Sequence, residues 1–143
     1  MSRQDVVAAA RARLGTRWRH QGRLNGVGLD CIGLVGDVAL ECGVPEAAGW
    51  ANDKALHAYG RTPDPKVLIA ACDKYLAWVL GPIELGDILV MKHEPETQPR
   101  HFAIVSRLDP MYVIHAYAQA KKVVENRVDE KWRSRILRVY RFR

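Results

Sequence analysis

One cysteine occupies a position where a thiol could act as a nucleophile. Cys31 follows a glycine-rich stretch, residues 16–29, and Asp30 can cap a helix that begins at the cysteine. The free N–H groups and the macrodipole at a helix N-terminus favour an anion, so we expect this position to lower the pKa of the thiol. The preceding glycines would let a substrate backbone approach closely. Cys31 is therefore the candidate nucleophile, with a buried structural cysteine as the alternative.

The other two cysteines have a different setting. Cys42 and Cys72 occur within apolar helical patterns, where a cysteine packs as a small hydrophobic residue. The spacing of the 3 cysteines matches no zinc motif. On one helix Cys31 and Cys42 would be about 16 Å apart, too far for a disulfide. We expect three free thiols, with no metal and no cofactor.

Two histidines could supply a base for the thiol. His101 and His115 each fall in a short apolar run that predicts a strand. If the hairpin between them folds about Leu108, the two histidines pair directly, with Cβ atoms about 5 Å apart. One could then act as base while the other fixes its tautomer. The alternative is that each is simply a half-buried strand histidine.

The remaining histidines, His20, His57 and His93, fall in loops, and we expect them to be solvated. The elements that must position the candidate residues are helices first and strands afterwards. Helices are predicted over residues 3–14, 31–42 and 65–79, with a short helix within 51–59 and a helical turn near 129–132. Strands are predicted over residues 87–91, 101–106, 111–117, 121–125 and 136–142.

This order predicts an α+β fold in a single domain, residues 1–143, with the N-terminal helices packed on a C-terminal sheet. The connections between the predicted strands are too short for crossover helices, so the sheet should be antiparallel. Gly33 and Gly36 each cost the second helix roughly 1 kcal/mol relative to alanine. They indicate that another segment packs very close to its first turns.

Four segments together resemble the ordered motifs of the NlpC/p60-type cysteine peptidases, and the resemblance extends over about residues 14–142. The segments are Gly28–Val35, Leu85–Val90, His101–Val105 and Ile114–Ala116. Residues 18–21 and 123–125, together with Trp132, look most like the phage-associated branch of that family.

The resemblance implies a papain-like α+β fold and hydrolysis of the stem peptides of bacterial peptidoglycan. The bond expected to be cleaved joins D-glutamate, through its γ-carboxyl, to the following diamino acid. On matching positions Cys31 would be the nucleophile, His101 the general base and His115 the orienting third member. The backbone N–H of Cys31 would meet the oxyanion, and Asp30 would act as a cap and loop anchor.

Three residues beside the nucleophile are predicted to contact substrate: Trp18, Asp30 and Ile32. Many relatives have tyrosine where this chain has Trp18, and an indole can donate but not accept a hydrogen bond. Many also have serine where Ile32 stands. Both departures concern the choice of substrate more than the chemistry of the thiol.

The charge distribution bears on partners. Lys and Arg number 22 against 16 Asp and Glu, a formal net charge of +6, with basic clusters near the N-terminus and over residues 127–143. Clustered positive charge suits an anionic partner such as the acidic stem peptides and polymers of a cell wall. No helix-turn-helix, zinc or aromatic-platform pattern favours nucleic acid, and no apolar run approaches the ~20 residues of a membrane helix.

The polar residues 1–5 precede no hydrophobic signal-peptide region. We therefore expect synthesis in a cytoplasm and delivery to the wall by other means, such as a phage tail with tail proteins as partners. Two alternatives remain: a structural tail-tip component that keeps the fold without activity, and a lipid-dependent cysteine acyltransferase. The first has no need of Cys31, His101 and His115 together, and the second predicts an apolar surface or anchor that the sequence does not show.

Overall fold

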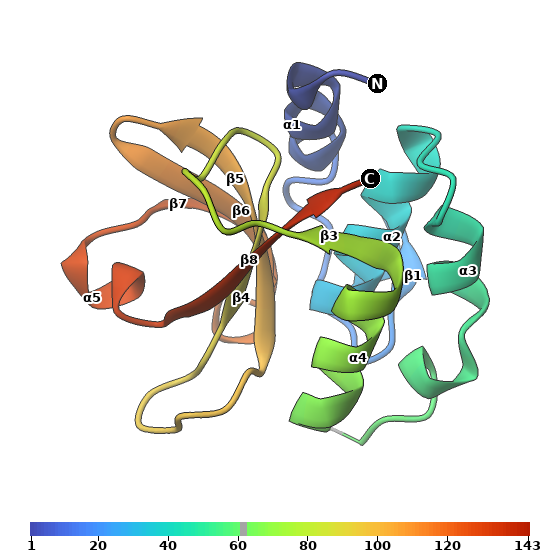
Figure 1. The fold of residues 1–143 in the computed structure, drawn as a ribbon. Helices are drawn as coiled ribbons and strands as arrows, with labels where there is room; N and C mark the ends of the chain where they lie inside the picture. The colour runs from blue at the N-terminus through green and yellow to red at the C-terminus, as the bar shows by residue number, and fades with distance from the viewer. Residues whose placement is uncertain (61–62) are drawn as a thin grey trace.

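The computed structural model describes residues 1–60 and 63–143 of the chain. Helices occupy the first half and a sheet most of the second half (Figure 1). The helices are α1 (Arg3–Arg11), α2 (Cys31–Glu41), α3 (Ala47–Asn52), η1 (Lys54–Leu56), α4 (Pro65–Tyr75), η2 (Ala118–Ala120) and α5 (Glu130–Arg133). The strands are β1 (Arg23–Leu24), β2 (Gly28–Leu29), β3 (Leu76–Trp78), β4 (Ile88–Met91), β5 (His101–Leu108), β6 (Met111–Tyr117), β7 (Lys122–Arg127) and β8 (Ile136–Phe142).

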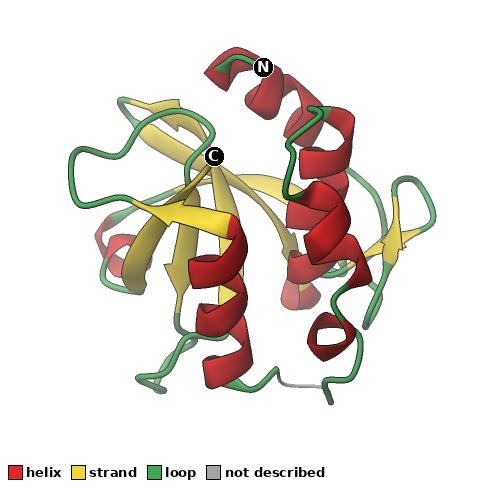
Figure 2. Ribbon diagram, turned by 45° about the vertical axis from the view of Figure 1, so that its right-hand side comes forward, coloured by secondary structure: helices red, strands yellow, loops and turns green. Residues whose placement is uncertain are grey.

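The main sheet has six strands in the order β3-β8-β4-β5-β6-β7, and every pairing in it is antiparallel. Helices α1 to α4 gather on one face of this sheet, and α5 lies on the other side (Figures 1 and 2). The predicted α+β class and the antiparallel sheet are confirmed. No helix within residues 1–60 or 63–143 has the length and apolar character of a membrane span.

Helix α2 is the central helix, and its sequence explains its burial. Eight of its 11 residues are buried, and Asp30 caps its N-terminus by accepting from the backbone N–H of Gly33. A Cβ atom at Gly33 would lie 1.9 Å from the carbonyl oxygen of Gly22, and one at Gly36 would lie 2.7 Å from Trp50 Cδ1. The predicted close packing at both glycines is confirmed. The loop before α2 therefore rests directly on its first turns and fixes where the helix begins.

Two predicted helices differ in the structure. The third helix ends at Tyr75 rather than near Val79, and Leu76–Trp78 continues as β3 against β8. Pairing with β8 satisfies the backbone there, which a local sequence pattern cannot show. In place of a helix within 51–59 the chain forms α3 and η1, because Asp53 ends the first in an extended conformation and caps the second.

The β5–β6 hairpin also differs from the prediction, with consequences for the histidines. Leu108 pairs with Met111 across a two-residue turn, whereas Ile104 pairs with Ile114, because a bulge at Ser106 shifts the register by one. The predicted direct pairing of His101 with His115 is therefore wrong. Without the bulge the two side chains would point to opposite faces of the sheet. With it they share a face and lie diagonally, close enough to bond.

Candidate active site

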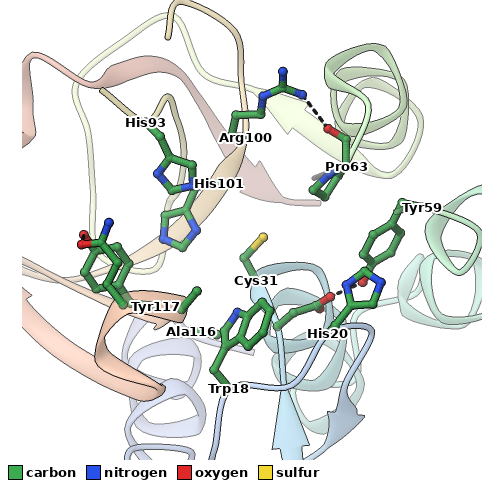
Figure 3. A pocket seen from close by; sticks show the side chains of 13 residues that line it. Trp18, His20, Cys31, Tyr59, Pro63, His93, Arg100, His101, Ala116 and Tyr117 are labelled. Atoms are coloured by element: carbon green, nitrogen blue, oxygen red, sulfur yellow. Dashed lines mark hydrogen bonds between the residues drawn. The ribbon is translucent and has the colours of Figure 1, made fainter. Parts of the chain in front are cut away.

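Cys31 and His101 line one pocket, of about 190 Å³, where the N-terminus of α2 meets the beginning of β5 (Figure 3). The Cys31 sulfur points into this pocket. The other described residues that line it are Trp18, His20, Asp30, Tyr59, Pro63, His93, Arg100, Ala116, Tyr117, Ala118 and Gln119. The structure thus brings together groups from five separate segments of the chain around the thiol.

The Cys31 thiol is almost completely enclosed, with only 8% of the residue exposed. Burial, with the negative charge of Asp30 second, raises the pKa of the Cys31 thiol to about 12. The backbone N–H groups of Phe102 and Ile32 act in the opposite direction but more weakly. The prediction of a lowered pKa is therefore wrong, because desolvation of the thiolate outweighs stabilisation at the helix N-terminus. At neutral pH the thiol is protonated and needs a base.

His101 belongs to a chain of three hydrogen-bonded side chains. His101 Nε2 lies 2.8 Å from His115 Nδ1, and His115 Nε2 lies 2.7 Å from Asn126 Oδ1. An amide oxygen only accepts, so His115 carries its proton on Nε2 and its Nδ1 accepts from His101 Nε2–H. This assignment leaves His101 Nδ1 with a free lone pair. The hydrogen bonds from His101 to His115 and from His115 to Asn126 therefore hold His101 in the tautomer that a general base needs.

Burial, the largest cause in each case, lowers the pKa values of both histidines, that of His101 well below its ordinary value. Both imidazoles are therefore neutral at neutral pH, as is the Cys31 thiol. No hydrogen bond joins Cys31 Sγ to His101 among the described residues, and catalytic hydrogen bonds of this kind often form only in the complex with substrate. The resting site is a neutral thiol beside a neutral base, and not a preformed ion pair.

This charge state predicts slow alkylation of Cys31. Iodoacetamide reacts with the thiolate, so the rate should rise steadily from pH 6 to pH 10 without a plateau, because the pKa of Cys31 is about 12. The measurement is carbamidomethylation of Cys31 by peptide mass spectrometry. Cys42 in the same sample is the internal comparison, because it is partly exposed. Fast alkylation with a plateau below pH 6 would contradict a neutral resting pair.

Asn126 is a site residue that the sequence motifs do not predict. It lies on β7 two residues beyond Val124, which pairs with His115, so its side chain shares the face of His115. We expect Asn126→Ala to lower kcat by about 10- to 100-fold, below the full 10²–10⁴ of general acid–base catalysis. Steady-state kinetics would check this, with Asn52→Ala as control because Asn52 is exposed and bonds only within α3. An unchanged kcat would show that Asn126 does not orient His115.

The three predicted substrate contacts have different outcomes. Trp18 and Asp30 line the pocket. Asp30 also accepts from Gly33 N, Gln21 N, Arg23 Nη1 and the Tyr59 hydroxyl, as the predicted cap and loop anchor.

The prediction for Ile32 is wrong. Ile32 is fully buried in the core, and its carbonyl accepts from the Trp50 indole. One step along a helix rotates a side chain by about 100°, so the residue after Cys31 turns away from the pocket. The Ile32 side chain therefore makes no polar contact with a substrate in the pocket.

The loop histidines are placed differently from one another. His57 is exposed, as predicted, and bonds to the Ala51 carbonyl. His93 is half-buried with its ring centroid 5.6 Å from that of His101, so its prediction as a solvated residue is wrong. His20 is exposed at the pocket rim, edge-on to Tyr59. Within the described residues, no group of three or more His, Cys, Asp or Glu side chains could hold a metal ion.

Similarity to known proteins lies in the structure and not in the sequence. No protein-family model matches the chain, and no curated protein is significantly similar. An NlpC/P60 family protein from Bacillus cereus ATCC 10987 superposes with a TM-score of 0.67 at 15% identity, over 99% of this chain and 40% of its own. The NlpC/p60 domain of the peptidoglycan hydrolase SagA gives 0.63 at 20% identity, over 98% of both chains.

The chain has the NlpC/P60 fold. An N-acetylmuramoyl-L-alanine amidase from Bacteroides uniformis ATCC 8492 shares it, with a TM-score of 0.61 at 16% identity over 99% of this chain and 98% of that one. The predicted resemblance and the papain-like architecture are thereby confirmed. This NlpC/P60-fold chain spans about two fifths of the Bacillus cereus protein. The phage-associated branch stays a prediction from the sequence.

Proposed function

We propose that this NlpC/P60-fold protein is a cysteine-dependent hydrolase of amide bonds in the peptides of peptidoglycan. The observation that carries the proposal is the pocket that Cys31 shares with the His101–His115–Asn126 chain. A thiol, a base of defined tautomer and an orienting chain are the parts that thiol-dependent acyl transfer needs. The peptidoglycan hydrolases among the structural neighbours support cell-wall peptide as the substrate.

The first half of the reaction forms a thioester. His101 Nδ1 takes the Cys31 proton as Sγ attacks the carbonyl carbon, and the carbonyl oxygen becomes an oxyanion. The Cys31 backbone N–H, at the first position of α2, has no partner within the helix and can donate to that oxyanion. When the C–N bond breaks, His101 passes the proton to the departing amine.

The second half of the reaction hydrolyses the thioester and regenerates the Cys31 thiol. His101 Nδ1, again neutral, takes a proton from water while the water oxygen attacks the thioester carbon. The C–S bond breaks, the product leaves as a carboxylic acid, and the proton on His101 goes to the Cys31 thiolate. Throughout, His115 accepts from His101 Nε2–H and so stabilises the imidazolium that forms in each half.

We propose the bond between γ-linked D-glutamate and the following diamino acid as the one cleaved. The competing bond joins the glycan to L-alanine, the substrate named for the amidase among the structural neighbours. A digest of purified sacculi, with products identified by mass spectrometry, separates the two. New fragments ending at D-glutamate support the first bond, and free stem peptides beginning at L-alanine support the second.

Wild type and Cys31→Ala are digested side by side, each shown to be folded and with its thiols reduced. Fragments released only by wild type are the expected result. No release by a folded wild type would contradict the proposal and favour a structural part that keeps the fold without activity.

We also propose, from the sequence resemblance of residues 18–21 and Trp132, that the protein acts at the wall as part of a phage tail. Mass spectrometry of purified phage particles from the strain that carries the gene would test this setting. Particles without the chain would contradict it, and the chemistry of the pocket would be unaffected.

A further inference from the structure

A fixed cation lies at the edge of the pocket and takes no part in the reaction described above. Arg100 immediately precedes His101, and its backbone N–H donates to the Met91 carbonyl at 2.9 Å, which continues the β4–β5 pairing. Its side chain lines the pocket on the side of Pro63, beyond the Cys31 sulfur (Figure 3). The backbone pairing that places the general base therefore also places this guanidinium.

The Arg100 guanidinium has neighbours on two sides, and some of its N–H donors have no hydrogen-bond partner among the described residues. Arg100 Nη1 donates to the Pro63 carbonyl at 2.9 Å. Its Nε is buried and has no hydrogen-bond partner, although it lies 3.4 Å from Glu96 Oε1. The Glu96 side chain is 42% exposed. Such an exposed pair is worth little. The Nη2 donors have no partner among the described residues, so a preorganised guanidinium keeps donors for a ligand.

The other charged group on the described pocket wall does not compete for that role. Asp30 already pairs with Arg23 at 2.8 Å and accepts from Gly33 and Gln21 N–H groups. Its negative charge is thus compensated inside the fold. Arg100 is the described lining residue that offers a permanent positive charge to a bound molecule.

We propose that Arg100 is a specificity-determining residue that binds a free carboxylate of the substrate at the edge of the pocket. Guanidinium and carboxylate form paired, charge-assisted hydrogen bonds, and an amide cannot replace the carboxylate without loss. The inference rests on the proposed function for its substrate class. In that class D-glutamate linked through its γ-carboxyl keeps a free α-carboxylate, and the diamino acid can carry another. Both can be amidated, so the site would distinguish the acid from the amide.

The test is peptide binding by the Cys31→Ala protein, which cannot turn over its ligand. The probes are the tripeptide L-alanyl-γ-D-glutamyl-meso-diaminopimelate, the same peptide with the D-glutamate α-carboxyl amidated, and the same peptide with the diaminopimelate side-chain carboxyl amidated. Calorimetry should show roughly 10- to 100-fold tighter binding of the free acid than of one of the amides. The amide that loses affinity identifies the carboxylate that Arg100 binds.

Variants in the same background assign the discrimination to Arg100. Arg100→Gln should bind the acid and the discriminating amide equally, and Arg100→Lys should fall between, because it keeps the charge without the paired geometry. The matched control is Arg107→Gln, an exposed arginine within β5 whose guanidinium lies over the ring of Tyr112. It should leave the discrimination unchanged. Thermal melts of each variant establish that it is folded.

Equal affinity for all three peptides, discrimination that persists in Arg100→Gln, or no binding of any peptide at millimolar concentration would each overturn the inference. Hydrolysis by wild type is measured separately on the same peptides. A wild type that discriminates in binding but hydrolyses none of them would remove the proposed hydrolase and leave the carboxylate site standing. A wild type that hydrolyses acid and amide alike, with no difference in binding, would remove the carboxylate site and leave the proposed hydrolase standing.

Discussion

Replacing Cys31 with alanine is expected to lower the release of peptide fragments from sacculi by at least about 10⁴-fold. The reason is that the proposed thioester cannot form without Sγ, and no other described thiol lines the pocket. The fold should survive, because alanine leaves only a small void at the N-terminus of α2. The measurement is the initial rate of fragment release, with circular dichroism to confirm the structure.

The controls for this prediction are the other two cysteines. Cys72 is fully buried in the core and Cys42 is half-buried at the end of α2. Cys72→Ala should lower the free energy of unfolding by about 1 kcal/mol and leave hydrolysis unchanged. Full activity in Cys31→Ala would refute the cysteine mechanism. Loss of activity in a folded Cys72→Ala would show that losing a thiol can abolish activity without that thiol being the nucleophile.

Replacing Asp30 with alanine is expected to lower the free energy of unfolding by about 3–5 kcal/mol. Asp30 is 5% exposed, caps α2, and accepts from Arg23 and Tyr59 as well as from two backbone N–H groups. Its loss leaves a partly buried guanidinium and several donors without their acceptor. Chemical denaturation at constant pH would measure the change.

Asp64→Ala is the matched control, because Asp64 caps another helix of 11 residues but from an exposed position. It should cost only about 1 kcal/mol, the usual value for an N-cap. An equally small cost for Asp30→Ala would mean that the buried contacts of Asp30 add nothing to its capping bond. The loop before α2 would then need another anchor.

Local patterns were enough to predict much of the frame around the site. The Asp30 cap, the helix that begins at Cys31 and the close approach at Gly33 all depend on residues within a few positions of one another or on the absence of a side chain. The order of helices and short strands was enough for the α+β class with an antiparallel sheet. Such features are readable because capping, glycine geometry and hydrophobic period act over short stretches of chain.

The site itself depended on contacts that no local pattern contains. The bulge at Ser106 decides that His101 and His115 share a face, and the β6–β7 pairing decides that Asn126 reaches His115. The loop position of His93 predicts a solvated side chain, yet its ring centroid lies 5.6 Å from that of His101. The placement of the three site residues follows from strand register. A shift of one residue would turn a side chain to the opposite face of the sheet.

By itself the sequence determined which residues could do chemistry here: a thiol at the beginning of a helix, two strand histidines, and the capping and glycine residues that set the helix in place. Only the tertiary structure decided their chemical state. Burial raises the pKa of Cys31 to about 12 and lowers that of His101, so the resting pair is neutral. Charge state depends on how much water and which dipoles surround a group, and those are properties of the folded molecule rather than of neighbouring positions in the chain.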